Sequence, residues 1–263
     1  MTVDHDTLVA EVYGVAARRL GEGPTRDAVV AAARACHAAA SAALAPLLEQ
    51  AKAGGQRVAC RSGCAFCCHQ HITVNPAELL EVADAVSAWP EERRAALRRR
   101  LEQDAPRIAA LDHQGRQAAR LACPMLDRGT GLCGAYEQRP IACRSHFSAL
   151  RTACERDFRN RGARRPADKG IPTLDAPKLR AAAASVGLEL ALDAIGLSVE
   201  PLELAVGLRL ALADPGLFDR WLAGENPFPP LAPHPASARA RLGHSYAGML
   251  GSVRVRLQRA KLI

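Results

Sequence analysis

The stretch TRDAVVAAARACHAAASAALAPLLEQAK, residues 25–52, decides the fold expected for this chain. It is built mostly from alanine and leucine, the strongest helix formers, and the Gly54-Gly55 pair that follows would end a helix. The composition repeats this bias, because 49% of the 263 residues are hydrophobic but only 4% are aromatic. Aromatic residues favour strands, whereas alanine and leucine favour helices. The sequence therefore predicts an all-α or mostly α fold.

Capping and helix-breaking residues predict further helices along the chain. Asn75, followed by Pro76 and Glu78, has the pattern of an N-cap with proline in the first turn. Pro106 is expected to kink or divide a long charged helix. The tail 252–258 fits a strand or a helix equally well. The predicted helices cover 76–88, 91–121, 176–195 and 200–212, and 163–177 is predicted to be a surface loop.

The length of the chain allows one large domain or two smaller ones. We expect 1–175 to form a helical domain that contains a cysteine-rich metal-binding centre. The remainder, 176–263, is expected to be a C-terminal helical segment packed on the same domain. Within it, five prolines make 226–235 an extended loop.

The N-terminus shows no sign of secretion. MTVDHDTLVAEVYG has acidic residues where a signal peptide would be basic, and it lacks an apolar segment. No run approaches the roughly 18 uninterrupted apolar residues of a membrane span. We therefore expect a cytoplasmic protein without a membrane partner. In that reducing compartment, nine cysteines favour metal or redox chemistry over disulfide bonds.

The formal net charge of +8 comes from 35 basic and 27 acidic residues, and nearly all the basic residues are arginine. The densest basic run, 151–165, could attract nucleic acid or another polyanion. No aromatic stacking platform is interleaved with these charges. The sequence therefore favours a solvated loop over nucleic-acid binding.

Four cysteines are concentrated in CRSGCAFCC, residues 60–68. Their spacing would place the thiols on one stripe of a helix or on one chelating turn. Thiolate is the preferred soft ligand for zinc and for iron-sulfur clusters, whereas free core cysteines occur singly. The isolated Cys36 has the setting of a core cysteine, and His37 beside it is expected at the surface. The dense group therefore predicts a metal site.

A second group of four cysteines follows at 123, 133, 143 and 154. Eight thiols would suit two four-cysteine zinc sites, one multinuclear site with bridging thiolates, or a four-cysteine iron-sulfur cluster with a second metal. Neighbouring side chains diverge in helices and strands alike. Cys67 and Cys68 are therefore expected to serve different metals or different edges of one cluster.

The pattern C-x3-C-x2-C-C, followed by CPMLD, GLCG and YEQRPIACR, resembles the YkgJ-type cysteine-cluster family of zinc- or iron-chelating domains. The resemblance covers about 60–154 and includes both cysteine groups in the right order. It implies zinc, iron or an iron-sulfur cluster as cofactor. The implied metal ligands are Cys60, Cys64, Cys67, Cys68, Cys123, Cys133 and Cys143, with Cys154 as an eighth.

A similar cluster in flagellin lysine methylases of the FliB type implies an alternative, an iron-sulfur enzyme that uses S-adenosylmethionine. Cys60, Cys64 and Cys67 also have the spacing of radical S-adenosylmethionine enzymes. Against this alternative, Cys68 adds a directly adjacent thiol, and the alternating strands and helices of the barrel in those enzymes are not indicated. A basic nucleic-acid-binding module is the second alternative.

Residues beside the cysteines are candidates for supporting roles. Arg139 and Arg144 would either lower the pKa of nearby thiols or pair with surface acids such as Glu137. Tyr136 is expected to pack over the site, and Pro140 to fix the local turn.

Other titratable residues are less distinctive. His69, His71 and His146 lie close to cysteines but are surplus as ligands when eight thiols are present. Asp127 and Glu78 could act as general acids or bases, although no spacing distinguishes them. The sequence thus implies a metal ion as partner, disfavours nucleic acid, and leaves open both a protein partner or substrate and any enzymatic reaction.

Overall fold

A computed structural model describes residues 5–21, 23–161, 171–229 and 246–263. These residues form eleven α-helices, one 3-10 helix and two short strands, which confirms a mostly α fold. The α-helices are α1 (His5–Leu20), α2 (Arg26–Ala53), α3 (Pro76–Ser87), α4 (Glu91–Ala109), α5 (His113–Ala119), α6 (Ile141–Arg144), α7 (Arg151–Arg159), α8 (Asp175–Ala194), α9 (Leu204–Ala213), α10 (Leu217–Leu222) and α12 (Tyr246–Arg259). The 3-10 helix η1 is Phe66–His69, and the strands are β1 (Thr73–Val74) and β2 (Leu202–Glu203).

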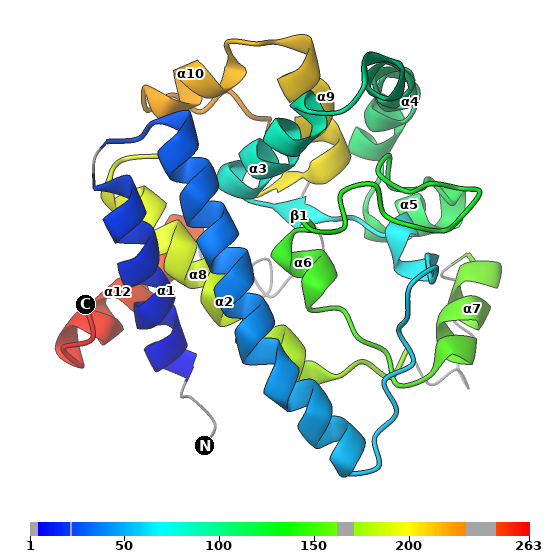
Figure 1. Ribbon diagram of the computed structural model, residues 1–263, viewed down its shortest axis with the longest axis horizontal. Coiled ribbons are helices and arrows are strands. Elements are labelled where there is room, and N and C mark those ends of the chain that lie inside the picture. The colour runs from blue at the N-terminus through cyan, green and yellow to red at the C-terminus, as the bar shows by residue number, and fades with distance from the viewer. Residues whose placement is uncertain (1–4, 22, 162–170, 230–245) are drawn as a thin grey trace.

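Helices α1, α2 and α8 lie side by side and form one half of the core (Figure 1). The helix predicted over 25–52 is α2, which ends at Gly54 as expected. Thr25 lies just before the helix as its N-cap, and its side chain accepts a hydrogen bond from Ala28 N at 3.2 Å. Helix α8 can approach α1 closely because Gly187 has no side chain. A Cβ atom there would lie 2.6 Å from the carbonyl oxygen of Val9. Helix α1 is an addition to the helices predicted from the sequence.

Helices α3, α4 and α9 form the other half of the core. The predicted start of α3 is confirmed as a full capping box. Asn75 Oδ1 accepts from Glu78 N at 3.0 Å, and the Glu78 carboxylate accepts from Asn75 N at 3.2 Å. Such reciprocal bonds satisfy backbone donors that the first helical turn leaves free.

The predicted helix over 200–212 is wrong at its start. Leu202 and Glu203 instead form β2, which pairs antiparallel with β1. The Glu203 carboxylate then caps α9 by accepting a hydrogen bond from Ala205 N at 2.7 Å. A two-residue strand has no periodicity that a sequence pattern could reveal.

The long charged segment predicted over 91–121 divides into α4 and α5. Pro106 lies within the last turn of α4 rather than at the junction, and Asp112 caps α5. The undecided tail 252–258 is helical, as part of α12. In the loop predicted over 163–177, residues 171–174 carry no helix, but 175–177 already belong to α8, so the predicted end of the loop is wrong. Residues 163–170, and 230–235 of the predicted proline-rich loop, lie outside the described residues.

His37 is buried with 3% of its surface exposed, so the expectation that it lies at the surface is wrong. Its ring contacts two acids of α3, Glu78 at 3.1 Å and Glu81 at 2.7 Å. Burial alone would lower the pKa of His37, but the two carboxylates outweigh burial and raise it to about 9. Helix α2 has the length and apolar composition of a membrane span, yet this ion-pair network joins it to α3 within the folded chain.

Candidate metal centre

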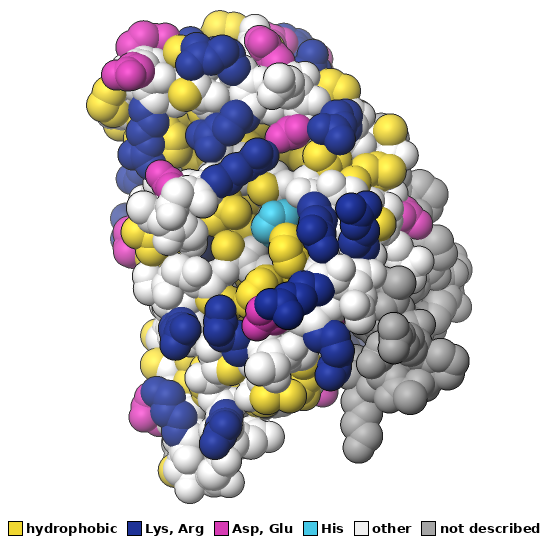
Figure 2. Space-filling model, turned by 90° about the vertical axis from the view of Figure 1, so that its right-hand side faces the viewer, with side chains coloured by type: hydrophobic (Ala, Val, Ile, Leu, Met, Phe, Trp, Pro, Cys, Tyr) yellow, Lys and Arg dark blue, Asp and Glu magenta, His cyan; other side chains and the backbone are white. Residues whose placement is uncertain are grey.

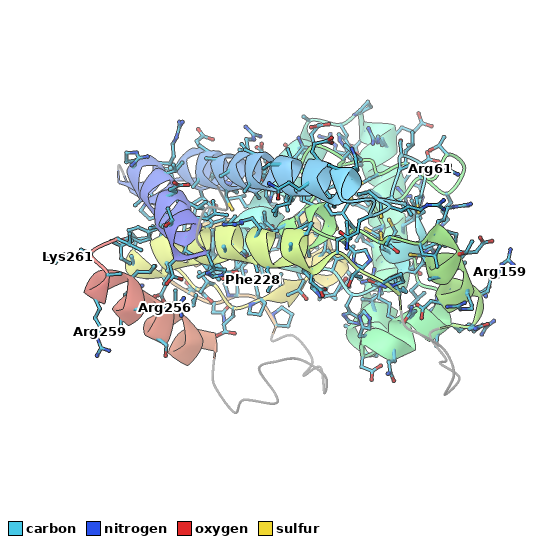
Figure 3. All side chains as sticks on the ribbon, turned by 90° about the horizontal axis from the view of Figure 1, so that it is seen from below. Arg61, Arg159, Phe228, Arg256, Arg259 and Lys261 are labelled. Carbon is cyan, nitrogen blue, oxygen red and sulfur yellow. The ribbon has the colours of Figure 1, made fainter. Side chains whose placement is uncertain are left out.

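Seven of the eight cysteines in the two groups line one cavity of about 320 Å³. The exception, Cys154, lies on α7 beside it. Sulfur atoms gather at the end of the molecule where Arg61 and Arg159 are labelled (Figure 3). The lining cysteines are Cys60, Cys64, Cys67, Cys68, Cys123, Cys133 and Cys143.

The first cysteine group is held by tight turns. Gly63 has a positive φ of 77° between Cys60 and Cys64, and Cys64 N donates to the Arg61 carbonyl at 3.1 Å. The backbone then enters η1, whose short turn carries Cys67 and Cys68. The sequence left open a helical stripe or a chelating turn for these residues, and the structure has the turn.

Two backbone contacts join the first group to the second. Cys123 N donates to the Cys68 carbonyl at 2.6 Å. Gly131 approaches Gly63 so closely that a Cβ atom on Gly131 would lie 2.8 Å from the Gly63 carbonyl oxygen. Because Gly131 also has a positive φ of 72°, both its conformation and its neighbour require glycine. These glycines are functional residues that the spacing of cysteines does not reveal.

Glu78 fixes the helix that carries Cys143. Its carboxylate accepts a hydrogen bond from Ile141 N at 2.7 Å, at the start of α6. Glu78 is buried with 2% of its surface exposed, and it also contacts His37. The buried network between α2 and α3 thus reaches the metal centre and positions the Cys143 turn, rather than supplying an acid or base to the cavity.

Several sulfur atoms accept hydrogen bonds from the backbone. Ser148 N donates to Cys60 Sγ at 3.2 Å. Backbone hydrogen bonds from Met125 and Ala135 counter, in part, the raised pKa values of Cys123 and Cys133. Bonds of this kind stabilise thiolates and are common around metal-bound sulfur.

Cys67 and Cys68 affect each other's ionisation. A hydrogen bond from the Cys68 thiol to the Cys67 sulfur lowers the pKa of Cys67 to about 7 and raises that of Cys68. Arg139 lowers the Cys67 pKa further. In the metal-free protein Cys67 is therefore the thiol most easily ionised among those whose pKa is shifted.

Burial is the largest cause of the raised pKa values of four cavity thiols, Cys60, Cys123, Cys133 and Cys143. The effect takes Cys123 to about 12, although the fully buried guanidinium of Arg116 acts against it. Cys143 and Cys133 are raised for the same reason, with Arg139 opposing. A bound metal cation would remove the cost of ionising a buried thiol, because the cation compensates the charge of the thiolate.

The thiols fall into two neighbouring sets. In the first set, burial raises the pKa of Cys60, and negative charge on Cys64, Cys67 and Cys154 raises it further. The pKa of Cys154 is likewise raised by burial and by negative charge on Cys64 and Cys67. Cys68 instead interacts with Cys123 and Cys143, which in turn are within range of Cys133. Cys67 interacts with members of both sets.

The donors fit a soft metal ion in number and chemistry, since zinc and iron-sulfur sites are built from converging thiolates. Among the described residues, however, no three side chains of His, Cys, Asp or Glu are grouped closely enough to hold an ion. The thiols line the wall of a cavity and do not converge on a single metal position. Binding would therefore require side-chain rotations that bring them together.

Arg139 and Arg144 have different roles. Arg139 is close enough to lower the pKa of Cys67, Cys133 and Cys143, and it stacks on Tyr136 with its guanidinium carbon 3.6 Å from the ring centroid. Tyr136 is about half exposed at the edge of the cavity.

Arg144 holds the loop that precedes it. Its guanidinium donates to the Arg139 carbonyl at 2.6 Å and to the carbonyl oxygen, not the carboxylate, of Glu137. It also donates to Ser41 of α2 at 3.3 Å. Arg144 therefore shapes the wall of the cavity.

The three histidines near the cysteines differ in placement. His71 and His146 line the cavity, whereas His69 packs against Phe158 with ring centroids 4.7 Å apart. Burial lowers the pKa of all three, so they are neutral near pH 7. Asp127 accepts backbone hydrogen bonds from Gly129 and Thr130 and shapes a turn.

The segment that contains both cysteine groups matches a known protein family. Residues 59–161 match the family model CxxCxxCC, described as "Putative zinc- or iron-chelating domain". The match covers both cysteine groups, so the resemblance to a cysteine-cluster family is confirmed for this part of the chain, and metal binding by it is supported. No curated protein and no solved structure matches the chain.

Proposed function

We propose that the protein binds two zinc or iron ions, or an iron-sulfur cluster and one further ion, through two four-thiolate sites. The first site consists of Cys60, Cys64, Cys67 and Cys154, and the second of Cys68, Cys123, Cys133 and Cys143. The observation that carries the proposal is that seven of these cysteines, distant in sequence, line one cavity with Cys154 beside it.

The division into two sites follows from the neighbours of each thiol. Cys154 interacts with Cys64 and Cys67, whereas Cys143 interacts with Cys123 and Cys133. Cys67 also interacts with Cys143, and we assign it to the first site because it interacts with Cys60 and Cys154 there. Four thiolates around one divalent ion carry a net charge of −2, which Arg139 and the backbone N–H donors partly offset. The thiols must stay reduced, which is consistent with a cytoplasmic location.

Metal analysis of protein purified without oxygen tests the proposal. We expect about two metal ions per chain for zinc, with a colourless solution, or iron with acid-labile sulfide and a brown solution for a cluster. A brown protein would keep the S-adenosylmethionine-dependent enzyme open as an alternative, and a colourless zinc protein would exclude it. Absence of both metals would contradict the proposal.

Paired substitutions test the division. Cys64→Ser with Cys154→Ser should remove the metal of the first site, and Cys133→Ser with Cys143→Ser that of the second. Cys36→Ala is the matched control, because Cys36 is buried in α2 and donates to the Ala184 carbonyl at 3.3 Å, away from the cavity. Loss of all metal from either pair would indicate one shared cluster instead of two sites.

A further inference from the structure

A basic face lies beside the metal centre. Figure 2 shows Lys and Arg side chains spread over this side of the molecule, where they outnumber the acidic side chains between them. Four arginines around the metal cavity and the neighbouring groove come from segments distant in sequence. Arg57 and Arg61 lie in the segment that follows α2, Arg120 follows α5, and Arg151 begins α7.

These four arginines are not neutralised within the described part of the chain, where they have no ion pair. The acids nearby have other partners. Glu155 pairs with Arg159 at 2.6 Å, and Asp157 accepts a hydrogen bond from Gln117. The charge on this face is therefore available to a ligand.

Two phenylalanine rings lie among the arginines. Phe66 of η1 and Phe158 of α7 contact each other with centroids 5.7 Å apart. The guanidinium carbon of Arg120 lies 4.8 Å from the Phe158 ring, and that of Arg151 lies 5.7 Å from the Phe66 ring. Sequence alone shows no such platform, because Phe66 is contributed by the first cysteine group, far from the basic run.

A groove of about 660 Å³ continues from this platform. Its lining includes Lys52, Arg57, Arg151 and Thr152, and no acidic residue. Lys52 is paired with Glu49 at 2.7 Å, whereas Arg57 is not paired. Arg151 belongs to both the groove and the platform, so the cationic surface is continuous from α2 to α5.

We infer that this face binds single-stranded nucleic acid. The unpaired arginines would contact phosphates, and bases would stack on the rings of Phe66 and Phe158. Planar guanidinium groups interleaved with aromatic rings are the features that single strands require, since every base offers a stacking face. An acidic peptide would use the charges but would leave the rings without a role, so it is the alternative outcome of the test.

Fluorescence anisotropy with a labelled oligothymidine of about 20 nucleotides, from about 50 to about 200 mM salt, tests the inference. Arg57→Ala combined with Arg151→Ala should weaken binding roughly tenfold or more and lower the salt slope by about 1.4. Phe158→Ala should weaken it about fivefold or more, with little change in slope.

Arg259→Ala combined with Lys261→Ala is the matched control. It removes the same charge from exposed positions at the opposite end of the molecule from Arg159 (Figure 3), and it should leave affinity nearly unchanged. The metal content of every variant is measured in parallel, so failure of this inference is distinguishable from failure of the metal proposal. Three results would overturn the inference: no binding at low salt, equal loss in the control pair, or equally effective competition by polyglutamate.

Discussion

Cys67 is distinguished from the other thiols by its ionisation. Cys68 and Arg139 hold its pKa at about 7, whereas burial raises those of Cys123 and Cys143. A thiolate that interacts with both sets of cysteines is the natural first ligand for an incoming ion, because the thiolate and not the thiol binds metal.

Labelling with iodoacetamide checks this difference. In reduced, metal-free protein near pH 7, we expect Cys67 to be alkylated before Cys123 and Cys143, as measured by peptide mass mapping over time. Bound metal should protect all three. Faster labelling of either buried cysteine would show that Cys67 is not the most ionised of the three.

The buried His37 makes stability depend on pH. Its pKa in the folded protein, about 9, lies above the ordinary value of 6.5, so the protonated ring stabilises the fold. The stabilisation is complete below about pH 6.5 and is lost as the pH rises through about 9. The shift corresponds to on the order of 3 kcal/mol.

Denaturant unfolding at several pH values tests this dependence. We expect the free energy of unfolding of the native protein to fall between about pH 6.5 and pH 9, and the His37→Gln variant to lose that part of the decrease. Comparison at equal metal content cancels the contribution of the thiols. Parallel curves for the two proteins would show that His37 is not protonated in the fold.

At the scale of elements, the contact between the Gly63 and Gly131 turns decides whether the two cysteine groups meet. Gly131→Ala adds a methyl group at 2.8 Å from a carbonyl oxygen, where neither backbone can move without shifting its cysteines. Gly55 is the matched control, since its φ of 78° is similar but no atom lies within 4 Å of its Cβ position.

Gly55→Ala should therefore cost about 1–2 kcal/mol through backbone conformation alone. Gly131→Ala should cost at least about 1 kcal/mol more, through overpacking, and should also weaken metal binding. Thermal melts and metal titration measure the two effects. Equal losses in both variants would mean that the turn yields without disturbing the site.

The elements that the sequence predicted are those with local signals. The cap at Asn75 and the glycine that ends α2 act within one turn, so they are visible in the sequence. The two cysteine groups were predicted from the family pattern. By contrast, the burial of His37, the β1–β2 pairing and the approach of Gly131 to Gly63 depend on residues more than 40 positions apart. Such contacts arise from packing, which composition and periodicity do not encode.

At the scale of the whole molecule, bound metal would connect segments that are distant in sequence. Helix α3 and its partners separate the two cysteine groups in sequence, while η1, α6 and α7 bring them to one end of the fold. Binding energy at a thiolate site is then also folding energy, on the order of 10 kcal/mol for a structural zinc site.

Removal of metal should therefore destabilise the entire chain. With excess chelator we expect the melting temperature to fall by roughly 10 °C or more, and zinc or iron, but not magnesium, to restore it. Circular dichroism at a helical wavelength measures the change. An unchanged melting curve after confirmed metal loss would show that the core is stable without the sites.

Because the turn at Gly63 packs against the turn at Gly131, the CRSGCAFCC motif cannot simply be moved into another protein. In isolation, a peptide with the sequence CRSGCAFCC would lack the Gly131 turn that packs on Gly63 and the Ser148 N–H that reaches Cys60. A designed protein that borrows the nonapeptide would need both partners, in the same geometry, to reproduce the cavity. The unit that can be grafted is therefore a pair of interlocking loops with their supporting helix, rather than a linear string of cysteines.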